Sequence, residues 1–315
     1  MYMIADKQQT DERAILVTDH VAEAGRKIFL QQLRRMKGQE VGSRTGEDIE
    51  SVHKMRVAVR RMRSLLRLVD DYYSGKSIAE TERGLRDIAR ALGAIRDLDV
   101  LILDLQDFSA PLPPDARQQA EALVSRFDRR RAKRRRRLNA YFDSRGYRRT
   151  LRQLESFAKL KRKHRRRLRR PYDPHELRHV LPLLLHQRLA SVRAYDTVLP
   201  AADDEHLHAL RVECKRLRYA IEFFAPVLGS SAERCLALIR SLQDTLGRIH
   251  DIAVFVSRLQ RLDKLPPAQA HLVEEYIERR NSELVELRVT FYAQRARFKT
   301  RAVQRDFSDA LLVLR

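Results

Sequence analysis

The sequence has no tryptophan and only two cysteines among its 315 residues. Cys214 and Cys235 stand alone, without CxxC or Cys/His spacing, so neither a disulfide framework nor a metal site is predicted. No cofactor is predicted, and a reducing, cytoplasmic location fits best.

No run of about 18 apolar residues occurs. Residues 1–10 carry mixed charge where a signal peptide would have a basic segment and then an apolar one. We therefore expect neither membrane spanning nor secretion.

Acidic residues are scarce relative to basic ones, because 64 Lys and Arg stand against 42 Asp and Glu, a formal net charge of +22. Such a charge attracts nucleic acid, anionic lipid or another polyanion. Much of it lies in two runs without acids: residues 129–137 hold eight Lys/Arg in nine positions, and residues 159–170 hold nine in twelve. Runs of this kind are usually solvated helix faces or flexible arms. We interpret them as raising general anion affinity without defining a site.

Strand-like alternation is absent, and apolar residues recur every three or four positions, as on one face of an amphipathic helix. Glycines 38, 42 and 46 and several prolines interrupt this pattern. Helices are predicted at about 15–36, 50–73, 80–108 and 111–144, and then at 176–199, 205–228, 233–262 and from 266 onward. The sequence therefore predicts an all-α fold.

Two pairs of segments repeat at nearly one offset. Residues 52–63 align with 207–218 at a shift of 155, and residues 92–98 align with 246–252 at a shift of 154. In the first pair every basic position except Lys54 has a basic partner. Two matches at nearly the same offset indicate an internal repeat. We expect one domain over residues 1–315, with repeats at about 12–158 and 175–315 and a basic connector at 159–174.

Each repeat contains a helix on which a row of cations borders the apolar side, one residue or about 100° further around. The first row comprises His53, Arg56, Arg60, Arg63 and Arg67, and the second comprises His208, Arg211, Lys215 and Arg218. A solvated helix face usually interleaves acids for pairing, but no Asp or Glu lies between His53 and Arg67. Like charges at this spacing repel, so an anionic ligand is the natural source of compensation.

The second repeated block places a glycine inside a predicted helix, where it costs up to about 1 kcal/mol relative to alanine. Gly93 and Gly247 therefore suggest close approach by another helix or by a ligand. Asp97 and Asp251, four residues later, could orient a neighbouring Arg or His, or form a buried structural ion pair. The matching cations on these helices are Arg86 with Arg240 and Arg96 with His250.

The two motifs together resemble the signature of the CHAD family, which occurs twice per domain. They read His-x-x-Arg-Val-x-x-Arg-Arg-x-Arg within residues 52–63 and Leu-Gly-x-x-Arg-Asp-x-Asp-Val at residues 92–100. The resemblance covers both copies and nearly the whole chain. It implies two four-helix bundles related by a pseudo-twofold axis, inorganic polyphosphate held in a shared basic central channel, and association with polyphosphate granules.

The resemblance also implies which residues bind. The family's basic positions fall on His53, Arg56, Arg60, Arg61 and Arg63, and on His208, Arg211, Lys215, Arg216 and Arg218. The second Arg-Asp motif departs from the pattern, since His250 corresponds to Arg96 and Ala253 to Asp99. No Glu-x-Glu-x-Lys motif of a triphosphate tunnel domain occurs, so the chain resembles the stand-alone form.

The histidines that begin the rows titrate near neutrality. Neighbouring arginines should lower the pKa of His53 and His208 in the empty protein, and a bound polyanion should raise it. Binding would then take up protons. The alternative is that both histidines are buried, neutral and brace the start of the helix.

Two other functions stay open. Nucleic-acid binding would explain the charge, but single-strand readers interleave stacking aromatics with cations, and the rows contain only Tyr219. A phosphoanhydride hydrolase would need a metal-binding carboxylate cluster or an activated nucleophile, whereas the acids near the rows are mainly Asp97, Asp99 and Asp251. We therefore expect a polyphosphate-binding protein that is not an enzyme.

Overall fold

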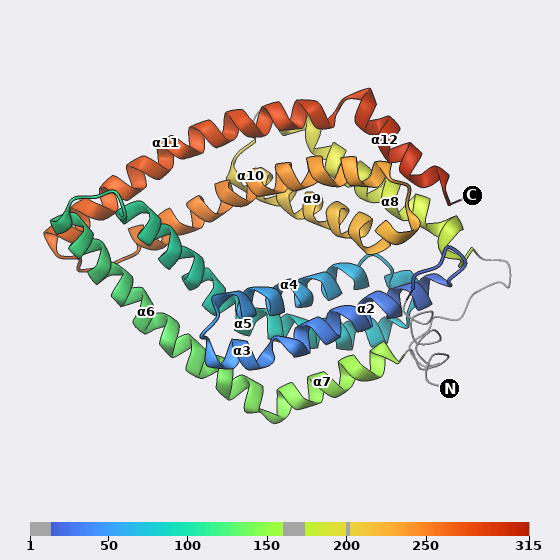
Figure 1. Cartoon of the computed structure of the whole chain (residues 1–315), viewed down its shortest axis with the longest axis horizontal. Coiled ribbons are helices and arrows are strands. Elements are labelled where there is room, and N and C mark those ends of the chain that lie inside the picture. The colour runs from blue at the N-terminus through green and yellow to red at the C-terminus, as the bar shows by residue number, and fades with distance from the viewer. Residues whose placement is uncertain (1–13, 160–173, 200–201, 315) are drawn as a thin grey trace, which may run out of the picture.

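The chain folds into helices throughout the described residues, 14–159, 174–199 and 202–314 of the computed structural model (Figure 1). The first six are α2 (Val21–Gly38), α3 (Glu40–Thr45), α4 (Ile49–Leu66), α5 (Gly75–Ser109), α6 (Pro114–Asp143) and α7 (Arg145–Ala158). The other five are α8 (Leu177–Arg193), α9 (Asp204–Phe224), α10 (Ser231–Gln260), α11 (Pro267–Phe298) and α12 (Arg301–Leu312). These residues contain no strand, only a single bridge between His20 and Glu176. The predicted all-α class is confirmed.

None of the helices in the described part of the chain combines the length and apolar character that crossing a membrane requires. The basic run at 159–170 lies, apart from Lys159, outside the described residues. The pseudo-twofold relation between the halves and the repeat boundaries stay predictions.

The helices differ from the predicted ones at the breaks between them. Gly42 lies inside α3, where an added Cβ would meet the Ser51 side chain of α4 at 2.3 Å. A separate helix, α7, follows α6 because Ser144 is extended and its hydroxyl caps Tyr147 N at 3.0 Å. The extended backbone of Thr300 likewise divides α11 from α12. The described residues therefore hold six α-helices before residue 160 and five after it, besides short 3-10 turns, where four helices per half were expected.

Two groups of helices pack side by side in the body of the molecule. In one group α2, α4, α5 and α7 contact one another, and in the other α9 contacts α8 and α10, which also contacts α12. The predicted apolar stripes are buried, including Val52 and Met55 of α4 and Leu207 and Leu210 of α9. Each such side chain contributes about 1.5–3 kcal/mol. One continuous core spans both groups, which meet where α4 packs against α9.

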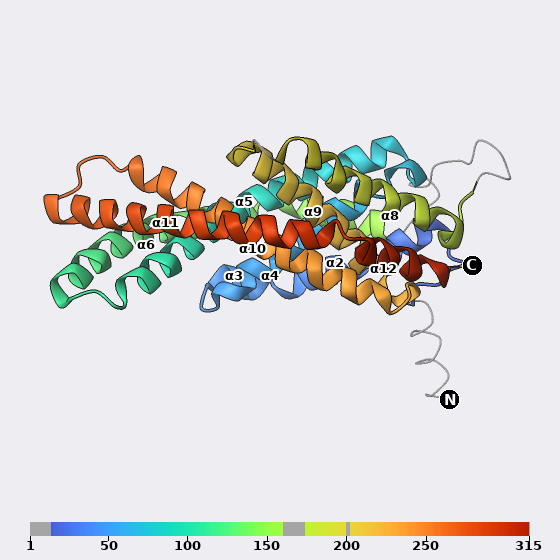
Figure 2. The ribbon, with the colours of Figure 1, turned by 90° about the horizontal axis from the view of Figure 1, so that it is seen from above.

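The halves meet a second time at the far end of the molecule. There the α5–α6 and α10–α11 hairpins lie side by side, as Figures 1 and 2 both show. A separate apolar cluster holds them together and includes Leu105, Phe108, Phe127, Phe255 and Tyr276. The α4–α9 contact and this distal junction together fix the relative positions of α5 and α10.

A buried charge network reinforces the distal junction. The Asp104 carboxylate of α5 accepts from the Tyr276 hydroxyl, from Arg280 Nε at 3.1 Å and from Arg248. Glu283 accepts from Arg280 Nη1 at 2.7 Å and from Arg248 Nη2 at 2.9 Å. Asp104 therefore joins α5 to both α10 and α11.

Replacement of Asp104 by alanine should destabilise the protein by about 3–5 kcal/mol, because removing one partner leaves buried charge uncompensated. Urea unfolding measures this loss. Asp107→Ala is the matched control, since Asp107 is exposed on the same helix. Equal losses in the two variants would contradict the role given to Asp104.

Candidate functional site

Four cations gather where α4 packs against α9. We call Arg56 and Arg60 of α4, with Arg211 and Lys215 of α9, the central cation cluster; all four side chains are half-buried. Among the described residues, no carboxylate oxygen lies within 4.0 Å of their side-chain nitrogens. The two rows recognised in the sequence therefore meet at this contact.

The repeated glycines lie beside this cluster. Arg56 Nε lies 3.9 Å from where a Cβ on Gly93 of α5 would stand, and Arg211 Nε lies 3.9 Å from the same point on Gly247 of α10. The neighbour of each glycine is thus an arginine side chain of the cluster. Both distances are those of an ordinary van der Waals contact, so the space at these positions would also admit a Cβ.

Burial and mutual repulsion disfavour charge on the cluster. Burial, followed by repulsion from Arg60, Arg211 and Arg56, lowers the pKa of Lys215 to about 7. Burial also lowers the pKa of Arg60 and of Arg211, although the nearby Asp251 carboxylate opposes this for Arg211. Unpaired buried charge is costly, so a nearby anion would stabilise these four cations.

Three histidines border the cluster. Burial, followed by repulsion from Arg96, lowers the pKa of His53, and burial followed by Arg211 lowers that of His208. The direction predicted from the sequence is correct, although burial outweighs the arginines. Nδ1 of His208 lies 3.1 Å from Nδ1 of His250. Burial, Arg211 and His208 lower the pKa of His250 to about 4.

Other predicted site residues already have carboxylate partners. Glu222 of α9 pairs with Arg61, and lies 3.8 Å from Arg218 and 3.6 Å from Arg240. Arg67 pairs with Glu82 at 3.2 Å, Arg216 with Glu213, and Arg96 with Glu50 at 3.9 Å. Glu213 and Glu222 were not predicted as partners, although Glu213 lies between Arg211 and Lys215 and Glu222 follows four residues after the end of the second row. Nothing in the sequence places Glu222 beside Arg61, 161 residues away.

The remaining predicted positions do not belong to the central cation cluster. Arg63 is half-buried and Arg86 is exposed, and neither pairs with a carboxylate of the described residues. Asp97 is exposed, and its backbone carbonyl accepts from Arg258 Nη1 at 3.1 Å. Asp251 is half-buried, where burial raises its pKa and Arg211 opposes the rise. Within the described chain neither aspartate forms the ion pair that was one of the alternatives.

Comparison with known proteins extends these observations. The family model of the CHAD domain matches residues 27–260, which include both cation rows and both glycine blocks. The CHAD domain from the plant Ricinus communis superposes with a TM-score of 0.70 and 23% identity, over 89% of this chain and 94% of that one. PptA from Streptomyces chartreusis superposes with a TM-score of 0.66 and 12% identity, over 88% and 99%. No curated protein sequence matches the chain.

The unfavourable position of Lys215 leads to a stability prediction. Lys215→Met keeps the apolar stem and removes the charge, so it should raise the free energy of unfolding at pH 7 by on the order of 1 kcal/mol. The pKa of Lys215 is lower in the folded protein than its ordinary 10.5. The gain should therefore shrink as the pH rises from about 7 towards 10.5. In this range Lys215 of the wild type is protonated when unfolded and neutral when folded, so the folded wild type no longer carries the unfavourable charge.

Urea unfolding at several pH values measures this gain, and Lys54→Met, at an exposed position of α4, is the control. A loss of stability in Lys215→Met that does not depend on pH would show that the ammonium group is favourably placed.

Proposed function

The chain belongs to the CHAD family, and from this premise we propose that it binds inorganic polyphosphate at the central cation cluster, as a binding protein and not as an enzyme. The observation that carries the proposal is the set of four half-buried cations without a carboxylate of the described chain within 4.0 Å. A ligand with closely spaced negative charges would relieve their repulsion.

The chemistry of the cluster suits phosphate. Arginine stays charged at every physiological pH, and its planar fork binds two phosphate oxygens at once, whereas lysine contributes a point charge. The cluster combines three arginines with one lysine from two helices. Polyphosphate places a negative charge on every unit, so neighbouring units can contact α4 and α9 together. Release of counterions would supply much of the affinity, as it does for nucleic acids.

Nucleic acid is a less suitable ligand for this site. Proteins that hold single strands stack bases on aromatic rings, and Tyr219 is the aromatic residue within the rows. Its ring is buried, with Arg60, Arg61 and Arg218 above it at 5.5, 5.2 and 5.0 Å from the centroid. A base could not reach that ring without displacing arginines.

The location we propose is the cytoplasm, at polyphosphate granules, where a bound chain segment would tether the protein.

Removing two cluster arginines should weaken polyphosphate binding. For Arg60→Gln with Arg211→Gln we expect at least about a tenfold loss per substitution, since a hydrogen bond to a charged group contributes about 1.5–3 kcal/mol. The logarithm of affinity should also fall less steeply with salt, because fewer counterions are exchanged. Titration with polyphosphate at several salt concentrations measures both.

The matched control is Arg67→Gln with Arg216→Gln, which removes two charges from the same helices but takes them from carboxylate pairs. If the control loses as much affinity as the cluster variant, net charge and not the cluster explains binding.

Binding should also depend on pH through Lys215. Its pKa of about 7 in the empty protein should rise when a polyanion binds, so binding takes up a proton above neutrality. Affinity should then fall as the pH rises above about 7. The three histidines should also take up protons on binding, at pH values below neutrality, because a bound polyanion would raise their lowered pKa values.

Lys215→Arg stays charged over this range and should flatten the fall above pH 7. Calorimetry in buffers of different ionisation heat counts the protons. Equal uptake by the wild type and Lys215→Arg at pH 8 would remove Lys215 from the mechanism.

A further inference from the structure

The basic run of α6 has two kinds of residue. Arg131 pairs with Asp99 at 3.4 Å and with Asp128 at 2.7 Å, and Arg135 donates to the Thr45 carbonyl at 2.9 Å. These two arginines serve the fold. The interpretation of the whole run as diffuse charge is therefore too coarse.

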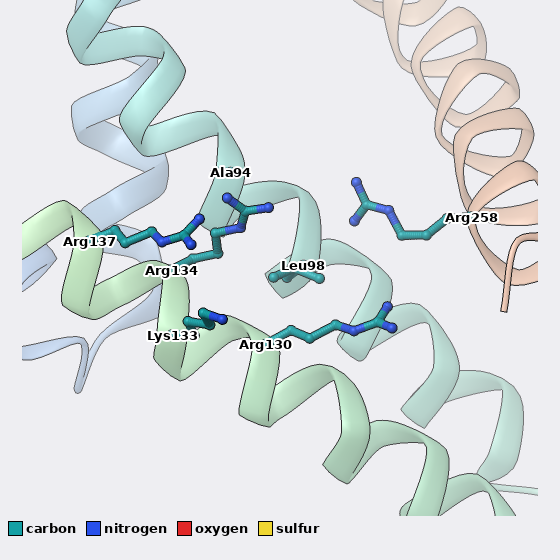
Figure 3. Close-up of a pocket in the computed structure, with 7 residues that line it drawn as sticks. All are labelled: Ala94, Leu98, Arg130, Lys133, Arg134, Arg137 and Arg258. Carbon is teal, nitrogen blue, oxygen red and sulfur yellow. The ribbon is translucent and has the colours of Figure 1, made fainter. Parts of the chain in front are cut away.

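Four other residues of the run line a cavity of about 440 Å³ between α5, α6 and α10 (Figure 3). They are Arg130, Lys133, Arg134 and Arg137. Their spacing of three, four and seven residues puts them on one face of α6. Ala94 and Leu98 of α5 and Arg258 of α10 complete the lining.

This cavity is lined by five cations and no carboxylate residue. None of the five has a carboxylate oxygen of the described residues within 4.0 Å. Arg258 is held in place by the hydrogen bond to the Asp97 carbonyl. Arg134 and Arg137 also line an adjoining cavity of about 360 Å³. Asp87 is the acidic residue in the lining of this adjoining cavity, and its carboxylate already pairs with Arg90 at 3.3 Å.

The cavity and the central cation cluster share helix α5. Gly93 lies beside Arg56 of the cluster, and the next residue, Ala94, lines both cavities beside α6. In Figure 3 the side chains of Arg134 and Arg258 reach towards the Ala94–Leu98 segment from opposite sides. A chain bound at the cluster and long enough to pass this segment of α5 would reach the cations of α6.

We propose that the α6 cavity is a second polyphosphate subsite, which is occupied by chains long enough to extend beyond the central cation cluster. This inference rests on the proposed function. The lining contains no aromatic ring on which a base could stack. Tyr141, in the adjoining cavity, already packs against Phe142 and Tyr147. The chemistry thus favours a chain of phosphates over RNA.

The test compares two double variants of α6. Arg134→Gln with Arg137→Gln removes charge from the cavity, and Arg129→Gln with Arg136→Gln removes equal charge from the same run. All four residues are exposed, but Arg129 and Arg136 line neither cavity. The probes are long-chain polyphosphate, tripolyphosphate and a single-stranded RNA, each titrated at one fixed salt concentration.

We expect the cavity variant to bind long-chain polyphosphate about tenfold or more weakly than the matched control, as for the loss of about 1.4 kcal/mol. Tripolyphosphate should bind both variants as it binds the wild type. Melting curves confirm that both variants fold.

Equal loss in the two variants would overturn the subsite, because diffuse charge would then suffice. A loss of tripolyphosphate affinity in the cavity variant would overturn the dependence on chain length. A loss confined to RNA would assign the cavity to nucleic acid. None of these results touches the central site, which fails only if Arg60→Gln with Arg211→Gln leaves the affinity for both polyphosphates unchanged.

Discussion

Repulsion between like charges across the α4–α9 contact is the constraint on which the candidate site depends. Arg56 and Arg60 face Arg211 and Lys215 at a half-buried position, where burial removes part of their hydration and no carboxylate oxygen of the described chain lies within 4.0 Å. Such an arrangement persists only if other interactions hold the helices in place. The continuous core on one side and the distal junction, with Phe127 and Tyr276 among its buried residues, do so. Packing in the core and at the distal junction thus offsets the repulsion among the four cations of the cluster.

Pairing with carboxylates separates the cations that stabilise the fold from those that can bind an anion. Glu222 lies within ion-pair distance of Arg61, Arg218 and Arg240. These three arginines therefore have a carboxylate partner within the fold. On α6, Arg131 is half-buried and has carboxylate partners, whereas Arg134 is exposed and lines a cavity that has no acidic residue. A net charge of +22 is therefore a poor guide to where an anion binds. The absence of a carboxylate partner, at the half-buried cluster and around the α6 cavity, is a better one.

The sequence allowed the class of fold and the two rows to be predicted, because both follow from periodicity along single helices. The cost of an interior glycine drew attention to Gly93 and Gly247, which lie beside arginines of the cluster, although only at an ordinary contact distance of 3.9 Å from an added Cβ. Pairs between distant helices could not be predicted. Nothing local to Arg61 indicates Glu222, and nothing local to Arg134 shows that α5 offers it a small residue, Ala94, and a cavity. Two of the three extra helices, α7 and α12, begin after Ser144 and Thr300, where capping and an extended backbone outweigh helical periodicity. The third, α3, lies where glycines predicted a break.

The side chain of Lys215 reports most directly on whether the central cation cluster is the polyphosphate site. Nuclear magnetic resonance of the lysine side chains, titrated with and without long-chain polyphosphate, gives its pKa in both states. The account predicts a pKa of about 7 in the free protein and a clear rise when polyphosphate is bound, because phosphate oxygens replace repulsive neighbours as the nearest charges. An ordinary lysine pKa in the free protein, or a lowered one that polyphosphate leaves unchanged, would contradict it.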